Sequence, residues 1–358
     1  MKYQDEYRNK ELCQYLIQKI RALTKTDIRL MEVCGTHTVS IFRSGLKAML
    51  PQNVHLISGP GCPVCVTPTS AIDHVIALSR MNNTMIATFG DMINVPGSSS
   101  SLKNEKAQGA DVRVIYSPFQ ALELAQDFPE KRVILLGIGF ETTIPLIASV
   151  VLESKKKSIK NFYLYSLGKL MPPVIRELIQ DRDTEIDGFL CPGHVSVIIG
   201  TEPYQFIPQE YSIPCVIAGF EPVDILYAIY CVIQQKIEHR PRVENKYERV
   251  VRKEGNPIAL HKMDEVFSAI DVEWRGIGRV NKSGLDLKAE YSELNAKNFQ
   301  VKIEKTKENP DCRCGEVLKG KISPLECPLF KSVCTPENPI GACMVSSEGT
   351  CATYYKYQ

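Results

Sequence analysis

Residues 132–154 read RVILLGIGFETTIPLIASVVLES, and this stretch decides the fold class. Residues 132–138 are almost entirely Val, Ile, Leu and Gly, a composition that predicts a buried strand. Apolar residues at helical spacing over 142–154 predict the helix that follows it. A strand without polar alternation is typical of a parallel sheet covered by helices on both faces. The stretch therefore predicts one strand–helix unit of an α/β fold.

The same alternation of short β-branched runs and longer amphipathic runs extends from residue 28 to about residue 236. Further strands are expected at 28–33, 54–58, 85–89, 112–116, 162–167, 186–190 and 215–219, with helices at 69–81, 118–127, 171–181 and 222–237. Such alternation indicates parallel sheets, as one barrel or two open sheets. Because the lysine-rich break at 155–160 lies near the middle, we predict two open, Rossmann-like domains, 28–154 and 155–238.

Composition limits the classes of function. The 43 basic and 41 acidic side chains give a net charge of +2, so the chain as a whole has no electrostatic footprint for nucleic acid or a membrane surface. No apolar run approaches the roughly 18 residues of a membrane span, and the N-terminus does not resemble a signal peptide. We expect a cytoplasmic protein, in which thiols stay reduced.

A cysteine-rich tail ends the chain. Six of the thirteen cysteines lie within residues 312–358: Cys312, Cys314, Cys327, Cys334, Cys343 and Cys351. In a reducing compartment such a cluster favours a metal over disulfides. Structural zinc usually shows two close C-x2-C pairs, whereas wide spacings suit an iron–sulfur cluster. We predict Cys314, Cys327, Cys334 and Cys343 as ligands of a [4Fe-4S] cluster, with Cys312 and Cys351 as alternatives and a zinc-stabilised interaction protein as a rival reading.

The region around this tail also differs from the α/β part. Residues 239–267 are charged and helix-prone, and residues 271–287 are rich in turn residues. At 358 residues the chain exceeds what one hydrophobic core usually supports. We therefore expect residues 1–27 and 239–358 to form a third, mostly helical and loop-rich domain that carries the cluster.

Chemically distinctive residues follow three of the predicted strands. Cys34 and His37 come after 28–33, Cys62 and Cys65 after 54–58, and Asp91 after 85–89. In open α/β sheets ligands bind at the carboxyl ends of strands, so these side chains are expected at one edge. Thiolates select soft metals, which makes Cys34, Cys62 and Cys65 candidate metal ligands. We expect His37 to be a ligand or a proton-carrying neighbour of the metal, and Asp91 an acid, base or hydrogen-bond acceptor.

The C-x2-C pair of Cys62 and Cys65 lies in a turn that Gly59 and Gly61 allow. Thr67 followed by Pro68 predicts a helix start, and the positive end of a helix favours thiolate over thiol. Low-pKa thiolates bind soft metal or close reversibly into a disulfide. The alternative is a cysteine pair that is buried only as packing.

Two other strand ends carry polar clusters. The turn before Glu141 resembles a phosphate-binding glycine turn, but it lacks a third glycine and places a carboxylate where phosphate charge would lie, so we do not expect a nucleotide. His194 follows Cys191 after strand 186–190. A catalytic Cys–His pair is conceivable there, although such pairs form by spatial rather than sequence adjacency.

Taken in order, the segments MEVCGTHT, GPGCPVC, TFGDM, GFETT, CPGHVS and MVSSEGTCA resemble the HypD family of hydrogenase maturation proteins. The resemblance extends from about residue 28 to residue 355. It implies two α/β domains and a third domain with a [4Fe-4S] cluster. It also implies a scaffold that, together with a small HypC-type chaperone, holds the iron on which the Fe(CN)2CO unit of nickel–iron hydrogenases is built. A HypE-type partner would deliver cyanide, and the hydrogenase large subunit would be the final recipient.

By position, Cys34, Cys62 and Cys65 match the iron-site and redox cysteines of that family, and His37 and Asp91 match residues of the same cleft. Glu141 and His194 lie in further family motifs, and Cys314, Cys327, Cys334 and Cys343 match the cluster ligands. Many relatives carry a second histidine where this chain has Val39. The resemblance implies a redox-active assembly scaffold rather than a turnover enzyme, with the cluster supplying electrons to the C-x2-C pair. The rival function is a stand-alone thiol–disulfide oxidoreductase.

Overall fold

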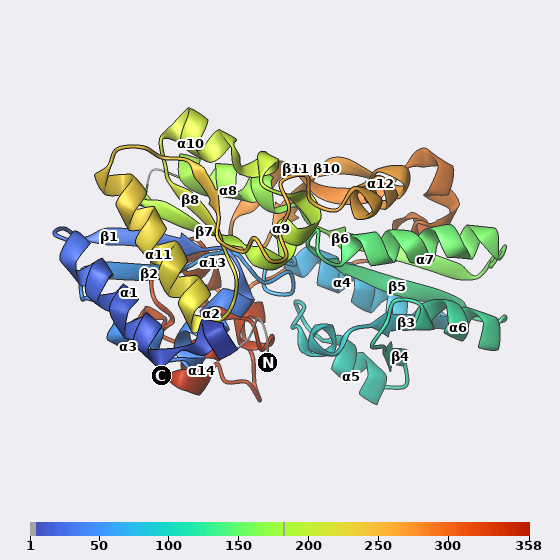
Figure 1. Ribbon diagram of the computed structural model, residues 1–358. Helices are drawn as coiled ribbons and strands as arrows, with labels where there is room; N and C mark the ends of the chain where they lie inside the picture. Colours follow the sequence, from blue (N-terminus) through green and yellow to red (C-terminus); the bar gives the residue numbers. More distant parts are fainter. Residues whose placement is uncertain (1–4, 182) are drawn as a thin grey trace.

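The fold is built on two parallel sheets. The computed structural model describes residues 5–181 and 183–358. Sheet A has the strand order β2-β1-β7-β8-β9, with β1 Ile28–Glu32, β2 Val54–Ser58, β7 Gly188–Pro192, β8 Cys215–Ala218 and β9 Val243–Asn245. Sheet B has the order β4-β3-β5-β6, with β3 Thr84–Thr88, β4 Asp111–Val114, β5 Arg132–Gly139 and β6 Phe162–Gly168. All pairs within both sheets are parallel, which confirms the predicted α/β class (Figure 1).

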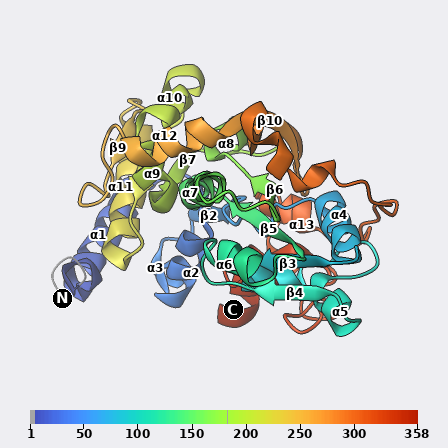
Figure 2. The same ribbon diagram turned by 90° about the vertical axis from the view of Figure 1, so that its right-hand side faces the viewer.

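Helices cover both sheets. One side of sheet A packs against α1 (Lys10–Leu23) and α11 (Pro222–Ile237), which lie side by side in Figures 1 and 2. Sheet B is covered by α4 (Thr69–Ser79) on one side and by α6 (Gln120–Asp127) and α7 (Ile144–Lys156) on the other. The inner strands of sheet B are buried on both faces: all five residues of β3 are buried, and so are all residues of β5 after Arg132. The edge strand β4 is partly exposed and carries Asp111 and Arg113. One core cluster contains residues of both sheets, so the two sheets are packed together.

The chain crosses from one sheet to the other between β2 and β3 and again between β6 and β7, and not at residue 155, where the boundary was predicted. β1 pairs with β7, and β5 pairs with β6, so sheet A is assembled from residues on both sides of sheet B. The chain leaves sheet A after β2, builds sheet B, and returns at β7. The lysine-rich run at 155–160 is the exposed end of α7 and the turn into β6 rather than a linker between domains.

The regions assigned to a third domain are divided in the structure. α1 buries Leu16, Ile17 and Ile20 against sheet A, so the N-terminal segment belongs to that sheet. β9 extends the same sheet. Within the helix-prone stretch 239–267 only α12 (Pro257–Val266) is an α-helix, and it packs on α7.

The turn-rich stretch forms an antiparallel hairpin, β10 (Phe267–Trp274) and β11 (Gly278–Leu287). The tail that follows is mostly irregular. Its helices are α13 (Cys314–Leu318), α14 (Thr350–Tyr357) and the 3-10 turns η6 (Pro324–Glu326) and η7 (Ala342–Met344). The tail is therefore loop-rich, as predicted, but less helical than expected.

The remaining helices are short. They are α2 Gly35–Arg43, α3 Leu46–Met49, α5 Leu102–Ala107, α8 Met171–Gln180, α9 Gly193–Ile199 and α10 Phe206–Tyr211, with 3-10 turns η1 Asp5–Arg8, η2 Gly90–Asn94, η3 Glu202–Tyr204, η4 Ala289–Leu294 and η5 Ala296–Asn298. Across residues 5–181 and 183–358, none of the helices combines the length and apolarity needed to cross a bilayer.

Candidate metal and thiol site

A cavity of about 440 Å³ lies where the carboxyl ends of strands from both sheets meet. Its walls come from the loops that follow β1, β2, β3, β5 and β7, together with one residue of the tail. Among the lining residues are Cys34, Thr36, Asp91, Thr142, His194 and Glu348. This is the position at which open α/β sheets bind ligands. The cavity is therefore the candidate site for a small substrate or cargo.

Cys34 faces this cavity and is 7% exposed. Its backbone N–H donates to Glu32 Oε2 at 3.3 Å, and the Thr38 hydroxyl donates to Glu32 Oε1 at 2.5 Å, so a buried carboxyl fixes the loop. Burial raises the pKa of the Cys34 thiol to about 12, and the charges of Glu348 and Glu32 add to this rise. A bound cation would act in the opposite direction and favour the thiolate.

The two cysteine loops touch at Gly61. A Cβ atom on this residue would lie 2.4 Å from the Cα atom of Cys34, closer than any real contact. The Gly35 N–H donates to the Gly61 carbonyl at 3.1 Å. Glycine is therefore required for the C-x2-C turn to lie directly against Cys34.

Neither Cys62 nor Cys65 lines the cavity, although their neighbours Gly61, Pro63 and Val64 do. The Cys62 sulfur accepts the Cys65 N–H at 3.4 Å, and the Cys65 thiol donates to the Ala342 carbonyl at 3.8 Å. Cys65 is fully buried, and its side chain also interacts with that of Cys343. The turn thus places Cys34 on one side, toward the cavity, and Cys65 on the other, toward the tail.

The expectation that a helix start would favour a thiolate at Cys65 is corrected. α4 begins at Thr69 with Pro68 as its N-cap, and the Thr67 hydroxyl donates to the Pro63 carbonyl instead of capping the helix. Burial raises the pKa of Cys65 well above its ordinary value. Desolvation by the surrounding core outweighs the partial charge of the helix end.

In the tail, Cys314 and Cys343 are in contact, with 2.6 Å between their sulfur atoms. The side chain of Cys343 also interacts with Cys65 and Cys351, and that of Cys314 with Cys312. A continuous series of thiols therefore connects the C-x2-C turn with the tail. All thirteen cysteines of the chain are free thiols in the structure.

This contact joins two of the four predicted cluster ligands, Cys314 and Cys343. Cys312, Cys327 and Cys351 are partly exposed, and Cys334 is 8% exposed. In residues 5–181 and 183–358, His, Cys, Asp and Glu side chains do not gather in a set of three or more that could hold a metal ion, so both ligand sets stay predictions.

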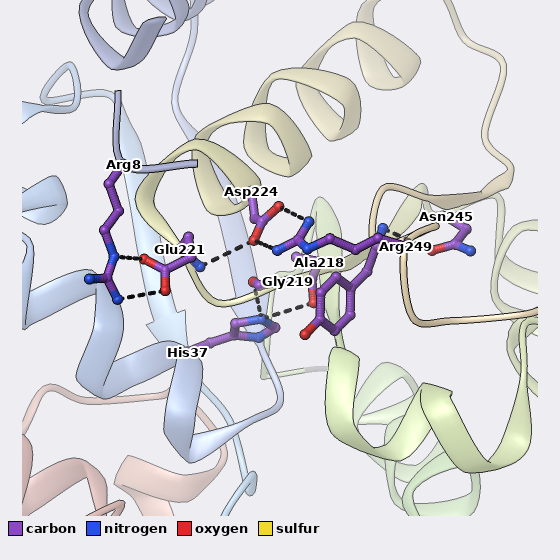
Figure 3. A network of polar contacts seen from close by, with 9 residues as sticks. Arg8, His37, Ala218, Gly219, Glu221, Asp224, Asn245 and Arg249 are labelled. Carbon is purple, nitrogen blue, oxygen red and sulfur yellow. Dashed lines mark hydrogen bonds and ion pairs between the residues drawn. The ribbon is translucent and has the colours of Figure 1, made fainter. Parts of the chain in front are cut away.

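His37 does not line the cavity and is completely buried. Figure 3 shows its ring directed toward Ala218 and Gly219. Its Nε2 donates to the Gly219 carbonyl at 2.9 Å, and its ring packs against Phe220 with 4.7 Å between centroids. Burial lowers the pKa of His37 to about 4, so the imidazole is neutral with its proton on Nε2. Nδ1 has no hydrogen-bond partner in the part of the chain that the structure describes.

The loop that receives the His37 hydrogen bond is fixed by two ion pairs. Arg8 donates to Glu221, with Nη2 2.8 Å from Oε1, and Arg249 Nη1 donates to Asp224 Oδ1 at 2.7 Å. Both pairs are visible in Figure 3 on either side of the histidine. His37 thereby connects α2 to the end of β8. Because α2 begins directly after Cys34, this hydrogen bond helps to hold the Cys34 loop in position.

Asp91 and His194 line the cavity, as their positions at strand ends suggested. Asp91 Oδ2 accepts a hydrogen bond from the Ser346 hydroxyl at 2.8 Å, which ties η2 to the tail. The His194 ring stacks on Phe220 with centroids 4.0 Å apart, and burial lowers its pKa. His194 is thus placed beside the cavity by an aromatic contact and not by a partnership with Cys191.

Glu141 does not line the cavity. Its Oε1 accepts the N–H of Met171, the first residue of α8, at 2.9 Å, and burial raises its pKa to about 7. Its Oε2 has no partner within the described residues. The carboxyl therefore connects the end of β5 with the start of α8, which is a structural position.

Glu348 was not singled out from the sequence. It lines the cavity, and its Oε1 accepts the Thr36 hydroxyl hydrogen bond at 2.6 Å. Gly35 permits this approach, because a Cβ on it would lie 2.5 Å from the Glu348 carbonyl oxygen. The only signal for Glu348 in the sequence was its place in the segment MVSSEGTCA, since nothing local brings residues 36 and 348 together.

Comparison with known proteins identifies the family of the chain. A family model described as "HypD: Hydrogenase formation hypA family" matches residues 11–358. The chain belongs to the HypD family. It is 43% identical to the hydrogenase maturation factor HypD of Escherichia coli and 45% identical to HypD2 of Bradyrhizobium diazoefficiens, covering all of this chain and 98% and 97% of those proteins. It is 42% identical to HypD of Cupriavidus necator, again over all of this chain and 97% of that protein.

Val39 lines a neighbouring cavity of about 700 Å³ that shares Thr36, Asp91 and Glu348 with the first. An apolar side chain therefore forms part of the wall beside the candidate site.

Proposed function

We propose that this chain is a hydrogenase maturation factor that holds iron while the Fe(CN)2CO unit is assembled. The observation that carries the proposal is the position of the C-x2-C turn between the two sulfur sites. Its Gly61 end touches Cys34 at the cavity, and its Cys65 end contacts Cys343 of the tail. If assembly of the iron unit consumes electrons, the scaffold needs a path from the tail cysteines to the iron ligand Cys34, and the C-x2-C turn lies on such a path. The names of the relatives, hydrogenase maturation factors matched over their full lengths, support the same role.

In this proposal the iron unit is cargo in the cavity. Cys34 supplies a soft thiolate ligand, suited to low-spin iron that is later handed on. His37 and Glu32 hold the Cys34 loop in place, and Asp91, His194 and Glu348 provide acceptors and a neutral imidazole at the cavity wall. A HypC-type chaperone would complete the ligands of the iron, a HypE-type partner would deliver cyanide, and the hydrogenase large subunit would receive the product.

The tail fits a [4Fe-4S] cluster by its donor chemistry, since it offers six cysteines. We propose Cys314, Cys327, Cys334 and Cys343 as holders of that cluster, with Cys312 and Cys351 as alternatives; when bound, the cluster would supply single electrons. Cys62 and Cys65 form a separate dithiol, which releases two electrons and two protons when it becomes a disulfide. The contact of Cys65 with Cys343 brings this dithiol next to the tail.

The test is to replace Cys34, Cys62 and Cys65 singly by alanine and to record iron-bound cyanide and carbonyl stretches in the complex with the partner chaperone. We expect the bands to be lost with Cys34→Ala and strongly reduced with the other two. Cys13→Ala, which changes a buried cysteine of α1 in the core beside sheet A and outside the cavity lining, is the matched control and should keep the bands. Unchanged spectra in all three variants would reject the proposal.

The rival function, a stand-alone thiol–disulfide oxidoreductase, is disfavoured by burial. The side chains of Cys62 and Cys65 are 3% and 0% exposed, so a protein disulfide cannot reach them in this structure. Thiol reductase activity toward a protein disulfide in the absence of partners and iron would favour that rival instead.

A further inference from the structure

A further cavity, of about 380 Å³, lies beside the carboxyl end of strand β6. Its walls are the end of β6 with the following residue Lys169, the start of α4, and the β10–β11 hairpin. Among the described residues it shares no lining residue with the cavity that Cys34 faces. Parallel sheets bind ligands at the carboxyl ends of their strands. This β6 cavity is therefore a second place where a ligand can bind.

Lys169 brings a charged group into the wall of the β6 cavity. The residue is 3% exposed, its Nζ donates to the Glu273 carbonyl at 2.7 Å, and the same nitrogen lies 4.7 Å from the centroid of the Trp274 ring. Within residues 5–181 and 183–358, no carboxylate oxygen comes within 4.0 Å of it. Lysines are almost never fully buried unless they are paired. The group that this lysine lacks is an anion.

The Lys169 amine also has donors to spare. A protonated lysine carries three N–H groups, and the Glu273 carbonyl is the one acceptor that the described part of the chain gives them. Burial lowers the pKa of Lys169 to about 7, and the charge of Glu273 offsets part of this effect. An anion bound in the cavity would accept from the remaining N–H groups and favour the charged amine.

A second lysine lines the same cavity. Lys297 Nζ lies 5.7 Å from the centroid of the Tyr165 ring. Burial lowers the pKa values of Lys169 and His74, and the charge of Lys297 lowers both further. Asp286 Oδ2 accepts from Lys297 Nζ at 3.0 Å and balances that amine. Two ammonium groups therefore line one cavity, and within the described residues only one of them has a carboxylate partner.

The neutral part of the lining suits an organic anion. The Tyr165 hydroxyl lies 3.1 Å from His74 Nδ1, and both side chains line the cavity as further polar groups. Val272, Leu285 and Ile303 form an apolar part of the wall. Small-molecule sites combine such apolar walls with a few polar groups, and the volume lies in their usual range. The cavity can thus take a charged head group with a short apolar body.

We propose that the β6 cavity binds a small organic anion, a carboxylate or a phosphate monoester. Its head group accepts hydrogen bonds from Nζ of Lys169 and of Lys297, and its apolar part lies against Leu285 and its neighbours. The head group supplies the negative charge that Lys169 lacks, and no covalent bond forms or breaks. The site is independent of the iron and cluster chemistry, because the residues that form it include no cysteine and none that lines the cavity at Cys34.

The experiment is a titration of the anaerobically purified full chain with butyrate, butyl phosphate and inorganic phosphate, followed by calorimetry and by tryptophan fluorescence. Trp274 is the single tryptophan of the chain and lies against the Lys169 amine, so its emission reports on this cavity. We expect an organic anion to bind with a Kd of about 1 mM or lower and to change the emission. Lys169→Met should weaken binding about tenfold or more, because hydrogen bonds to a charged group are lost. Lys169→Arg, which keeps the charge, should weaken it less.

Lys131→Met is the matched control. Lys131 lines a different cavity and is paired with Asp111 at 2.7 Å, so its removal should leave the affinity unchanged. A preference for butyrate or for butyl phosphate identifies the head group. Inorganic phosphate that binds as tightly as butyl phosphate would overturn the apolar part of the site.

Two results reject the β6 cavity as an anion site. One is a wild-type chain that binds none of the three probes, and the other is binding that is equally tight in K169M, which would place the probe elsewhere. If K169M does not fold, Lys297→Met takes its place, since the Lys297 side chain is 29% exposed and tolerates replacement more easily. An affinity in K297M equal to that of the wild type would then reject the site.

Discussion

At the scale of single residues, Glu141 illustrates how a buried ionisable group couples folding to pH. Burial raises its pKa from an ordinary value of 4.5 to about 7. The folded state therefore binds a proton that the unfolded state has released between these values. The resulting stabilisation is complete below pH 4.5 and is lost as the pH rises through 7, an effect of roughly 3 kcal/mol at most.

We accordingly predict that Glu141→Gln removes this dependence, because an amide cannot ionise but can still accept the Met171 N–H. The stability of the variant relative to the wild type should increase between pH 5 and pH 8, measured by thermal unfolding in anaerobic buffer. Glu177→Gln, an exposed change in α8, the helix whose first N–H Glu141 accepts, is the control and should follow the wild-type profile. Parallel profiles for E141Q and the wild type would show that Glu141 does not carry the linkage.

Residues at strand ends were predictable because the rule that places ligands there needs only local sequence. Cys34, Asp91 and His194 do line one cavity. Glu348 was not predictable, since its hydrogen bond with Thr36 joins positions 312 residues apart. Cys314 and Cys343 were expected to lie close together, because both were assigned to one ligand set. That their sulfur atoms are in direct contact could not be predicted, since spacing along the chain limits which cysteines can meet but does not determine their geometry.

At the scale of elements, α14 is fixed to α2 and α3 by one tyrosine, Tyr354. Lys47 Nζ donates to the Tyr354 hydroxyl at 2.6 Å and lies 4.4 Å from the ring centroid of Tyr354. The Phe42 ring packs on the same tyrosine with 4.5 Å between the ring centroids.

We predict that Tyr354→Ala destabilises the protein by roughly 3–5 kcal/mol, the usual cost of deleting a buried aromatic ring. It should also increase hydrogen–deuterium exchange across residues 343–358, where Cys351 and Glu348 lie. Lys356→Ala, an exposed change in the same helix, should alter neither, and unchanged exchange in Y354A would mean that the tail is fixed elsewhere.

Elements with strong periodicity were predicted closely. The expected helix at 222–237 is α11 itself, and the expected strand at 132–138 is β5 to within one residue. The β10–β11 hairpin was missed because β10 is exposed along most of its length and carries charged residues, so it lacks the apolar pattern of a strand. β9 is only three residues long and is recognised by its pairing with β8 alone.

At the scale of the whole molecule, sequence predicted the class of fold but not the order in which the chain visits the two sheets. Alternating strands and helices look the same whether a sheet is continuous in the sequence or interrupted by another. The interruption has a functional consequence, because the carboxyl ends of β1, β2 and β7 in sheet A come to face those of β3 and β5 in sheet B. A chain divided at residue 155 would have offered two separate edges and no shared cavity.

This topology gives a prediction about fragments. A fragment of residues 1–154 contains β1 and β5 but lacks β7 and β6, their partners on one side. Leu30 and Met31, completely buried in the intact protein, would then lie at an unpaired edge. We expect no cooperative thermal transition for this fragment by circular dichroism.

The matched control is the full chain with a protease site in the exposed turn at 155–160. Cleavage of the folded protein at this site breaks the chain at the same point but leaves every strand pair intact, so the thermal transition should persist. A cooperative transition of the isolated fragment would show that residues 1–154 fold on their own, contrary to the interleaved pairing of the two sheets.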